Sequence, residues 1–452
     1  MNNTDTICAL ATASGGALGI VRVSGANAFD AVSAICRIDC RSVAANTIHY
    51  AHIVNAKGET IDEAMVSVFR APHSYTGEDS VEISCHGSRY ILNKVLELLV
   101  QNGCRMANPG EYTQRAYLNG KMDLSQAEAV ADLIASTNRA AHQVAMNQLK
   151  GGFSSELKTL RTQLLQLTSL LELELDFSDH EDLEFADRTA LFNLATTIDQ
   201  RIQKLANSFE IGQVLRNGIP VAIVGKTNVG KSTLLNRLLG DERAIVSDVH
   251  GTTRDTIEDT LDIDGIQFRF IDTAGLRQTS DEVEQIGIER TKQKIKEARI
   301  VLWLLNGRPT SEEQQEMNQL TKGKSRICIH TKADLVDMKA FVPYFLPMLL
   351  ISAKTGMGID ALKNRILEEA RLAGFNGNET IVTNARHYDV LCRAHTSIQR
   401  VIDGLSSTAP VPPDLLAEDL RQVLDILAEI TGGQITPQET LNNIFSHFCV
   451  GK

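Results

Sequence analysis

One stretch of the sequence has the residue types and the spacing to bind a phosphate group. It reads Gly-Lys-Thr-Asn-Val-Gly-Lys-Ser at positions 225–232. Small residues let backbone N–H groups close around phosphate oxygens, and a helix directly after the loop adds the positive end of its dipole. We expect the Lys231 amine to reach the β- and γ-phosphates of a nucleotide and the Ser232 hydroxyl to bind Mg²⁺. A plain glycine turn would explain the glycines but not Lys-Ser at this offset.

The sequence on both sides of the loop predicts the elements that position it. The apolar run Ile219 to Val224 is typical of a buried strand, and residues 233–239 continue as a helix. Asp264-Gly265, between residues 256–263 and 266–271, predicts a hairpin that adds an antiparallel edge strand. Alternation of strands and helices indicates a mostly parallel α/β sheet with ligand loops at the carboxyl ends of its strands. The other predicted strands are Gln267 to Ile271, Ile300 to Leu305, Ile327 to Ile329 and Met348 to Ile351.

Two segments fall where a guanine-nucleotide site senses the γ-phosphate. Thr253, in Gly251-Thr252-Thr253, offers a second hydroxyl to Mg²⁺. Asp272-Thr273-Ala274-Gly275 directly follows a predicted strand, so we expect Asp272 to hold the water shell of the metal. The Gly275 N–H is expected to contact the γ-phosphate. Loss of that phosphate would release both segments, which makes them a nucleotide-dependent switch.

Two later segments are typical of loops that recognise guanine. Thr331-Lys332-Ala333-Asp334 follows a predicted strand and is similar to the N-K-x-D motif. The Asp334 carboxylate can accept hydrogen bonds from N1 and N2 of guanine, a pairing that adenine does not supply. Thr331 stands where Asn is usual, so the sequence predicts that the side-chain amide bracing this loop is missing, and the nucleotide affinity stays open. Ser352-Ala353-Lys354 follows the next strand and is similar to the last guanine-contacting loop.

The group that orients the hydrolytic water is less evident. Leu276 follows Asp-Thr-Ala-Gly where Ras-like enzymes place a glutamine, and an apolar side chain does not position water. Glu284 is the candidate for this role, directly or through a bridging water. The Asn228 carbonyl is a candidate ligand for a monovalent cation beside the phosphates, where other enzymes use an arginine finger. Arg254 and Arg277 stay open as alternatives, with surface charge an equal explanation of both.

The two flanks of the nucleotide region predict one helical domain split by an insertion. Ser125 with Glu128 is typical of a helix start. One apolar stripe has three- and four-residue steps, and it comprises Leu157, Leu160, Leu164, Leu167 and Leu171. A second stripe comprises Leu415, Leu420, Val423, Leu424 and Leu427. Neither flank can bury its stripe alone, so we expect the two to pack together. The predicted segments are a mixed α+β domain over 1–120, the helical domain over 121–212 and 378–452, and the nucleotide domain over 213–377.

The composition is that of an ordinary globular protein. The chain has 452 residues, 43% hydrophobic and 22% charged, with a formal net charge of −11. A net negative charge does not indicate a nucleic-acid-binding surface, so contact with RNA needs a local basic patch or a partner protein. No apolar run approaches the ~20 residues of a membrane span, and no membrane association is expected. The N-terminus has no signal-like start and the eight cysteines have no C-x-x-C spacing, so we expect a reducing cytoplasm.

These motifs, with Phe448-Cys449-Val450-Gly451-Lys452, resemble the MnmE (TrmE) family of tRNA-modification GTPases over the whole chain. The more specific signatures are Gly251 to Asp255, Asp272 to Arg277 and the Cys-x-Gly-Lys end. The resemblance implies an N-terminal folate-binding and dimerisation domain, a discontinuous helical domain and an inserted Ras-like P-loop GTPase domain. It implies a homodimer with potassium-stimulated GTP hydrolysis. With the FAD-dependent protein MnmG it would form a heterotetramer, with tRNA in the complex, and add an aminomethyl or carboxymethylaminomethyl group at C5 of the wobble uridine.

The resemblance also assigns site residues by matching motifs. Magnesium would be held by Ser232 and Thr253, and Glu284 matches the catalytic glutamate. Potassium would be surrounded by Asn228, Ser247, Val249 and Thr252. A tetrahydrofolate derivative, in the 5-formyl or methylene form, would contact Arg22, Glu82, Lys121 and Lys452. The full set expected at GTP is Asn228, Val229, Gly230, Lys231, Ser232, Thr233, Ser247, Asp248, Val249, His250, Gly251, Thr252, Thr253, Asp272, Thr273, Ala274, Gly275, Thr331, Lys332, Ala333, Asp334, Ser352, Ala353 and Lys354.

Other interpretations stay open from the sequence. A ribosome-associated or assembly GTPase would use the nucleotide only to toggle its affinity for a partner, but the chain lacks the basic appendage of such proteins. The N-terminal domain has no clear set of acid–base residues for folate chemistry of its own. The more useful hypothesis is that this domain presents a one-carbon unit to the flavin of the partner protein. Cys449 matches the family cysteine near the C-terminus and is a candidate for a chemical role, with a buried inert thiol as an equal alternative.

Overall fold

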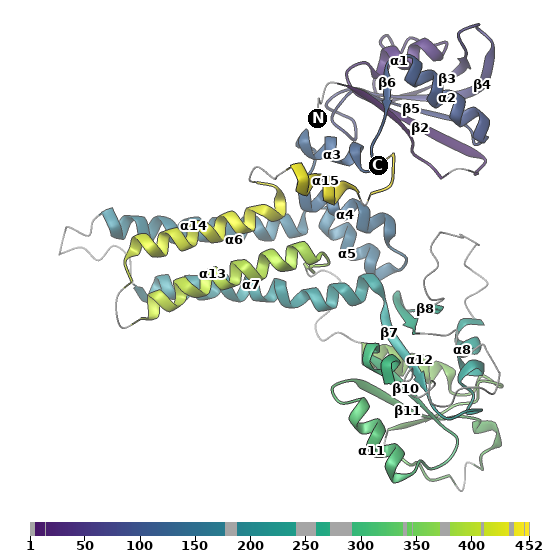
Figure 1. Cartoon of the computed structure of the whole chain (residues 1–452), viewed down its shortest axis with the longest axis vertical. Helices are drawn as coiled ribbons and strands as arrows, with labels where there is room; N and C mark the ends of the chain where they lie inside the picture. Colours follow the sequence, from purple (N-terminus) through teal and green to yellow (C-terminus); the bar gives the residue numbers. More distant parts are fainter. Residues whose placement is uncertain are drawn as a thin grey trace. The chain divides into compact units, whose positions relative to one another are not determined.

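The computed structural model describes residues 5–13, 15–176, 188–240, 259–271, 292–337, 341–345, 347–370, 380–407, 411–433, 438–446 and 448–451. Figure 1 shows the helices and strands of the chain. The chain divides into two units. Unit 1 comprises Met1–Ile134, Met146–Ile202 and Asp389–Lys452. Unit 2 comprises Ala135–Ala145 and Gln203–Tyr388.

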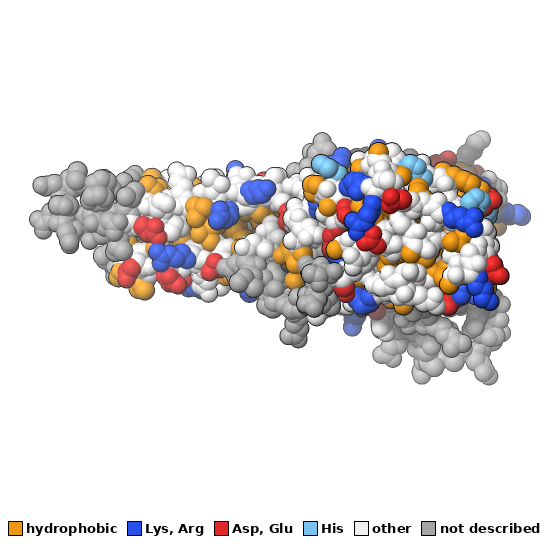
Figure 2. All heavy atoms as spheres, turned by 90° about the horizontal axis from the view of Figure 1, so that it is seen from above, with side chains coloured by type: hydrophobic (Ala, Val, Ile, Leu, Met, Phe, Trp, Pro, Cys, Tyr) orange, Lys and Arg blue, Asp and Glu red, His pale blue; other side chains and the backbone are white. Residues whose placement is uncertain are grey.

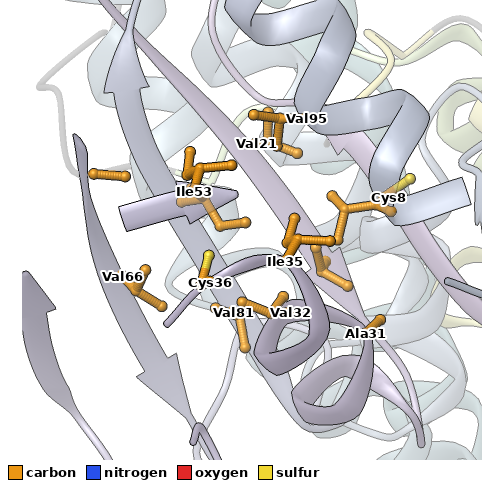
Figure 3. Packing of buried hydrophobic residues seen from close by; sticks show 14 of the residues in the cluster. Cys8, Val21, Ala31, Val32, Ile35, Cys36, Ile53, Val66, Val81 and Val95 are labelled. Atoms are coloured by element: carbon orange, nitrogen blue, oxygen red, sulfur yellow. The ribbon is translucent and has the colours of Figure 1, made fainter. Parts of the chain in front are cut away.

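Unit 1 contains a six-stranded sheet in the order β3-β4-β5-β2-β1-β6. Neighbouring strands are antiparallel except β1 and β6, which are parallel. Two helices pack against one face, and residues along β2 to β5 mostly alternate between buried and partly exposed, whereas β1 is buried at four of its five positions. Figure 3 shows Val21, Val66 and Val81 of the sheet near Ile35 and Val95 of these helices. The elements are β1 Thr6–Leu10, β2 Leu18–Ser24, α1 Ala28–Ile35, β3 Thr47–Val54, β4 Thr60–Phe69, β5 Ser80–His86, α2 Arg89–Gln101 and β6 Cys104–Met106.

The helices come from stretches far apart in the sequence. Helix α6 lies along α14 (Figure 1), and Arg421 of α14 pairs with Glu172 of α6 at 2.6 Å. The five leucines of the predicted α6 stripe are all buried. The expected packing of the two flanks against each other is therefore confirmed. The helices are α3 Glu111–Leu118, α4 Leu124–Ala135, α5 Arg139–Leu149, α6 Gly152–Asp176, α7 Arg188–Asn217, α13 Ala385–Ser406, α14 Pro413–Thr431 and α15 Gln438–Ser446.

Two details predicted for these helices are wrong. Helix α4 is capped by Asp123, not Ser125, because the Asp123 carboxylate accepts from the Gln126 N–H and the Gln126 side chain accepts from the Asp123 N–H, both at 3.0 Å. This pair has the capping-box spacing two residues before the predicted pair, so the helix starts earlier. Ser125 lies in the first turn instead, and its hydroxyl donates to Asp123 at 2.7 Å. On α14, Leu415 is 56% exposed and Leu416 takes its place in the buried stripe.

Unit 2 contains a second six-stranded sheet, in the order β12-β11-β10-β7-β9-β8. All neighbouring strands are parallel except β8 and β9. Apolar residues cover both faces, and β10 is buried along its whole length. The predicted parallel sheet with an antiparallel edge strand is thus confirmed. The elements are β7 Ile219–Val224, α8 Lys231–Gly240, β8 Asp259–Ile263, β9 Ile266–Phe270, β10 Ile300–Leu305, α11 Ser311–Leu320, β11 Ser325–His330, the 3₁₀ turn η1 Ala333–Leu335, β12 Met348–Leu350 and α12 Ile359–Ala370.

The hairpin between β8 and β9 has the predicted two-residue turn. Asp264 and Gly265 both have positive φ angles, 54° and 80°, as a type I′ turn requires. The Gly265 N–H donates to the Asp262 carboxylate at 2.8 Å, which fixes the turn.

The chain passes between the units inside four helices. The divisions fall after Ile134 in α4, after Ala145 in α5, after Ile202 in α7 and after Tyr388 in α13. The domain bounds at 120, 212 and 377 stay predictions. No helix in the described part of the chain has the length and apolar character needed to cross a membrane.

Candidate functional site

Residues 225–232 connect β7 to α8, so a strand and a helix hold the phosphate loop as predicted. Gly225 has φ +154°, and a Cβ there would lie 2.6 Å from the carbonyl oxygen of Leu304 in β10. Only glycine fits this close approach. Asn228 and Gly230 also have positive φ, 58° and 100°. The loop is therefore coiled tightly beside the central strands, which is the backbone shape that a phosphate cradle requires.

The Lys231 amine is held over this loop. Its Nζ donates to the carbonyl oxygens of Gly225 and Lys226, both at 2.8 Å. Burial lowers the pKa of Lys231, and repulsion from Lys294 adds to this effect. An amine already positioned over the loop loses little rotamer entropy when it turns to a phosphate.

The first turn of α8 presents the hydroxyl groups expected at the metal. Ser232 and Thr233 are both exposed there, directly after Lys231. Hydroxyl oxygens are ligands that suit Mg²⁺, which binds one or two protein oxygens together with phosphate oxygens. The exposed Ser232 hydroxyl at the helix N-terminus therefore fits the proposed magnesium ligand.

Thr331 braces the guanine loop through its hydroxyl, although the side-chain amide of the usual Asn is missing. It is 4% exposed, and its hydroxyl lies 2.8 Å from the carbonyl oxygen of Val229 and 3.2 Å from that of Leu305. The amide is absent, as predicted from the sequence, and the Thr331 hydroxyl supplies a brace of its own. Thr331 thus ties the guanine loop to the phosphate loop and to β10.

Replacing Thr331 with valine is expected to destabilise unit 2 by about 1–3 kcal/mol. Valine keeps the shape, but the buried Val229 carbonyl loses its donor. Urea unfolding followed by the fluorescence of Trp303, the only tryptophan, measures the change. Thr260→Val is the matched control, because Thr260 is exposed on the edge strand β8 of the same unit. Equal midpoints for Thr331→Val and the natural chain would show that the hydroxyl contributes nothing.

Asp334 and Ser352 connect the two predicted guanine loops. The hydrogen bond from Ser352 is the main reason that the pKa of Asp334 lies below its ordinary value, with burial opposing it. The Ala333 N–H donates to the carbonyl oxygen of Ile351 at 3.0 Å, which joins the two loops through the backbone as well. Lys332 precedes them with φ 58°. An ionised, exposed carboxylate with a fixed orientation is what pairing with the two N–H groups of guanine requires.

A hollow of about 310 Å³ adjoins the phosphate loop. Its lining comes from Lys226 to Val229, from residues 304–309 at the end of β10 and just after it, from Glu313 and from Lys332. Lys226 pairs with Glu313 at 2.6 Å, and this contact lowers the pKa of Glu313. Glu313 also forms a capping box with Thr310 at the start of α11. The hollow lies at the carboxyl ends of parallel strands, where sheets of this kind bind ligands.

The structure describes part of the predicted nucleotide site. It brings the phosphate loop together with residues 331–334 and connects these to residues 352–354. Most of the other predicted site residues fall in two stretches, 241–258 and 272–291, which precede and follow the β8–β9 hairpin in the sequence. The predicted site residues outside the described ones are Ser247, Asp248, Val249, His250, Gly251, Thr252, Thr253, Asp272, Thr273, Ala274, Gly275, Glu284 and Lys452.

A second polar site surrounds Arg22 in unit 1. Arg22 of β2 lies opposite Glu82 of β5 in the sheet register, and their side chains pair at 2.7 Å. The Arg22 guanidinium lies 5.5 Å from the ring centre of Tyr75 and 5.6 Å from that of Tyr112. The Tyr112 hydroxyl donates to the Arg22 carbonyl oxygen at 2.7 Å. Arg22 Nη1 also donates to the carbonyl oxygen of Gly451 at 3.2 Å. We call these five residues the Arg22 site.

The segment around Gly451 is docked beside this site. A Cβ at Gly451, where φ is +94°, would lie 2.3 Å from the carbonyl oxygen of Leu10. The Gly110 N–H lies 3.4 Å from the carbonyl oxygen of Cys449 and donates to it. The Cys449 side chain is exposed, so the alternative of a buried inert thiol is wrong. A chemical role for Cys449 stays a prediction.

Lys121, the third described residue predicted to contact folate, borders the loop that carries Tyr75. Its Nζ donates to the carbonyl oxygen of Pro72 at 2.8 Å. A Cβ at Gly77 would lie 3.3 Å from the Lys121 side chain. Arg22 and Lys121 therefore approach the same loop, Arg22 through Tyr75 and Lys121 through Pro72.

Sequence reasoning missed a charged network in the same domain. Arg115 of α3 is 2% exposed and pairs with Asp5 at 2.6 Å, Glu111 at 3.0 Å and Glu78 at 3.2 Å. Arg105 pairs with Asp5 at 2.7 Å and Glu111 at 2.6 Å. Each carboxylate therefore faces at least one guanidinium, which offsets the cost of burying charge. The only sequence signal was the four-residue spacing of Glu111 and Arg115 on one helix.

Acid is expected to weaken this domain through Glu111. Burial alone would raise the pKa of Glu111, but hydrogen bonds from Arg105, the Asn108 N–H and Arg115 outweigh it and hold the pKa below its ordinary value of 4.5. The pKa is lower in the folded chain, so the ionised carboxylate stabilises the fold above about pH 4.5. That contribution is lost as the pH falls through the lowered pKa.

Urea unfolding of Glu111→Gln at pH 7 and pH 4 measures this contribution. The substitution is expected to lower the unfolding free energy by about 1.5–3 kcal/mol at pH 7 and by less at pH 4, where the contribution has begun to fall. Glu97→Gln is the control, since Glu97 pairs with Lys94 at the surface of α2, where an ion pair contributes about 0–1 kcal/mol. The same loss at both pH values would contradict the expected linkage.

Comparison with known families agrees with this geometry. A family described as "MnmE helical domain" matches residues 124–449, and one described as "GTP-binding protein TrmE N-terminus" matches residues 6–121. The chain belongs to the MnmE family. The resemblance inferred from the motifs is confirmed, as are the multidomain fold and the discontinuous helical part.

Members of the MnmE family match the chain over its full length. The protein of Bacteroides thetaiotaomicron is 51% identical over 472 residues, and those of Phocaeicola vulgatus and Bacteroides fragilis are 50% identical over 500 and 478 residues. In each case the match covers 100% of both chains. All three proteins carry the name tRNA modification GTPase MnmE.

Proposed function

We propose that the chain is a GTP hydrolase that acts in tRNA modification. Family membership supports this, because full-length relatives bear that name. The observation that carries the nucleotide assignment is the connection of three loops. Thr331 donates to the phosphate-loop carbonyl of Val229, and Asp334 next to it receives the Ser352 hydroxyl. Hydrogen bonds thus connect the phosphate loop to the loop that carries Asp334, the residue proposed to recognise guanine.

The residues predicted at the nucleotide have distinct tasks in this proposal. The backbone of residues 228–233 and the Lys231 amine bind the phosphates, and Asp334 selects guanine. Ser232, with Thr253, holds Mg²⁺, which when bound neutralises charge on the β- and γ-phosphate oxygens. Glu284 orients the attacking water, directly or through a second water.

Potassium is assigned to Asn228, Ser247, Val249 and Thr252. The left-handed backbone of Asn228, with φ 58°, supports this by exposing a polar residue in the loop beside Lys231. Replacing Na⁺ with K⁺ is expected to raise GTP turnover at least about tenfold, because a positive charge beside the phosphates stabilises the transition state. Turnover in matched chloride salts measures this. Asn228→Ala should remove the difference and the exposed Thr227→Ala should keep it, whereas equal rates in the two salts for the natural chain would defeat the assignment.

The N-terminal domain is proposed to bind a tetrahydrofolate derivative, in the 5-formyl or methylene form, through Arg22, Glu82, Lys121 and Lys452. The aromatic and charged surroundings of Arg22 support this assignment. Pairing of two N-terminal domains in a homodimer is supported by exposed apolar residues on neighbouring strands. These are Ile48 at 62%, Tyr50 at 58% and Met65 at 44% exposure.

The proposed reaction adds an aminomethyl or carboxymethylaminomethyl group at C5 of the tRNA wobble uridine, in a heterotetramer with FAD-dependent MnmG. The chain would supply the nucleotide-driven movement and the folate, and MnmG the flavin. Figure 2 shows Lys and Arg side chains interspersed with Asp and Glu on the face displayed. This mixed surface and the net charge of −11 support contact with tRNA through the complex. All eight cysteines are free, which supports a reducing cytoplasm as the location.

Mass spectrometry of tRNA nucleosides tests the proposal. A strain without this gene is expected to lose the modified wobble uridine, and the natural chain, but not Lys231→Ala, should restore it. Unchanged nucleosides in the deletion strain would defeat the modification assignment. Co-purification of ribosomal subunits without a flavoprotein would favour the alternative of a ribosome-associated or assembly GTPase.

A further inference from the structure

We propose that a largely buried hydrogen-bond network around Glu78 positions Tyr75 of the Arg22 site to stack on the ligand. The inference rests on the proposed function, because that ligand is the tetrahydrofolate derivative. The residues involved are all described by the structure and all belong to unit 1. We call the following five residues the Glu78 network: Ser24, Thr76, Glu78, Ser80 and Arg115.

The sheet register places this network next to the Arg22 site. Ser24 of β2 lies opposite Ser80 of β5, two positions along from the pair formed by Arg22 and Glu82. Residues two positions apart on a strand point to the same face of a sheet. Both serines are buried on that face, at 0% and 6% exposure. The two cross-strand pairs are therefore neighbours on one face.

Three hydroxyl groups of the network contact one another. The Ser24 oxygen lies 2.8 Å from that of Thr76 and 3.1 Å from that of Ser80, and the Thr76 and Ser80 oxygens lie 3.3 Å apart. The Ser24 hydroxyl donates to the Glu78 carboxylate at 2.8 Å, and the Glu78 N–H donates to the Thr76 hydroxyl at 3.2 Å. Thr76 and Glu78 belong to the segment that connects β4 to β5. This segment is thus bound to both strands that carry Arg22 and its partner.

The Glu78 carboxylate is also fixed by Arg115 of α3. Their side chains pair at 3.2 Å and are 16% and 3% exposed, so water and salt screen the pair little. Arg115 is held in turn by Asp5 and Glu111. Hydrogen bonds between charged groups are stronger than those between neutral ones. The Glu78 network therefore holds the β4–β5 segment against β2, β5 and α3 at once.

Tyr75 directly precedes Thr76 in this segment, so the network fixes its backbone. Its hydroxyl lies 2.9 Å from the Thr113 hydroxyl of α3, which fixes the far end of the side chain. The ring centre lies 5.5 Å from the Arg22 guanidinium, within the range of cation–π attraction. Tyr75 is nevertheless 37% exposed. The result is an oriented aromatic ring beside a cation, with part of its surface open to a ligand.

A tetrahydrofolate derivative has groups that match this surface. Its aminobenzoyl ring is flat and aromatic, and its glutamate part carries carboxylates. A flat ring stacks on tyrosine, while Arg22 and Lys121 offer positive charge to a carboxylate. Lys121 contacts the same β4–β5 segment through the carbonyl oxygen of Pro72. A ring that is already oriented lowers the entropic cost of binding, so we assign the Glu78 network the role of positioning Tyr75.

A double-mutant cycle on the full chain tests this role, with Kd for 5-formyltetrahydrofolate measured by calorimetry. Tyr75→Ala is expected to raise Kd at least about tenfold, and Tyr75→Phe, which keeps the ring, less than about threefold. Ser24→Ala removes the donor to Glu78 and should raise Kd at least about fivefold. Because Ser24 acts through Tyr75, the variant with both alanines should bind within about twofold of Tyr75→Ala alone.

Ser33→Ala is the matched control. The Ser33 hydroxyl of α1 accepts from the Cys40 N–H at 3.0 Å, so this variant also loses one hydrogen bond of the N-terminal domain, and Kd should stay within about twofold. Additive losses in the double variant would overturn the inference, as would an unchanged Kd in Tyr75→Ala or equal rises for Ser33→Ala and Ser24→Ala. A natural chain that does not bind 5-formyltetrahydrofolate would instead overturn the folate assignment on which the inference rests.

Discussion

Lys231→Ala is expected to lower GTP turnover and GTP affinity by at least about 100-fold, because the variant loses the one amine that the structure holds over the phosphate loop. The amine already hydrogen-bonds to the carbonyl oxygens of Gly225 and Lys226. Its removal takes away a positive charge that is partly shielded from water, where interaction with phosphate is stronger than at the surface. Titration with a fluorescent GTP analogue measures affinity, and phosphate release measures turnover.

Lys226→Ala is the matched control for this substitution. Lys226 lies in the same loop, but its amine pairs with Glu313, and its side chain is 71% exposed. An exposed ion pair contributes about 0–1 kcal/mol, so we expect affinity to change less than about fivefold. Equal losses in the two variants would mean that general positive charge, and not the position of Lys231, binds the phosphates. Unfolding curves for both variants establish that the loop is intact.

Glu284→Ala is expected to keep GTP affinity within about threefold and to lose turnover by about 10²–10³-fold. A positioned acid–base group contributes on this scale, and Leu276 does not supply one at the usual position. In the proposed function Glu284 acts in the catalytic step and not in the phosphate cradle, so GTP binding should persist. The same titration and phosphate-release assays separate the two effects.

Glu282→Ala removes a carboxylate two residues away and is the control. It should retain turnover within about threefold, since only one side chain of this short acidic stretch is assigned to the water. Normal turnover in Glu284→Ala would transfer the role to Arg254, Arg277 or another group. Loss of binding in Glu284→Ala would instead place the carboxylate in nucleotide recognition.

Local patterns predicted the elements whose sequence and surroundings agree. The strands β7 and β10 have the predicted bounds, Ile219–Val224 and Ile300–Leu305, because both are apolar runs buried on two faces. The Asp264-Gly265 turn was predictable because few residue pairs adopt two positive φ angles in succession. The cap of α4 was misplaced because two overlapping pairs share the same spacing, and the sequence alone does not rank them.

Contacts between distant residues account for what the sequence did not reveal. The motif named Asp334, but not the Ser352 hydroxyl that orients it. It showed that Thr331 lacks the usual amide, but not that the Thr331 hydroxyl reaches the Val229 carbonyl oxygen. The bond from Arg22 to Gly451 spans 429 positions, and no periodicity reports a pairing of that kind. The motif therefore identified candidate residues, and the structure supplied the partners that hold them.

The division of unit 1 by the nucleotide region has a consequence for how the protein folds. During synthesis residues 203–388 leave the ribosome after α6 and before the helices α14 and α15. The partner of α6 therefore emerges late, since Arg421 lies 249 residues beyond Glu172. The N-terminal sheet has its core within residues 8–104 and can form early. Contacts between residues that are far apart in the sequence form slowly. We therefore expect refolding in which both sheets form first, and in which the α6–α14 pair and the Arg22 site are completed together in the last and slowest phase.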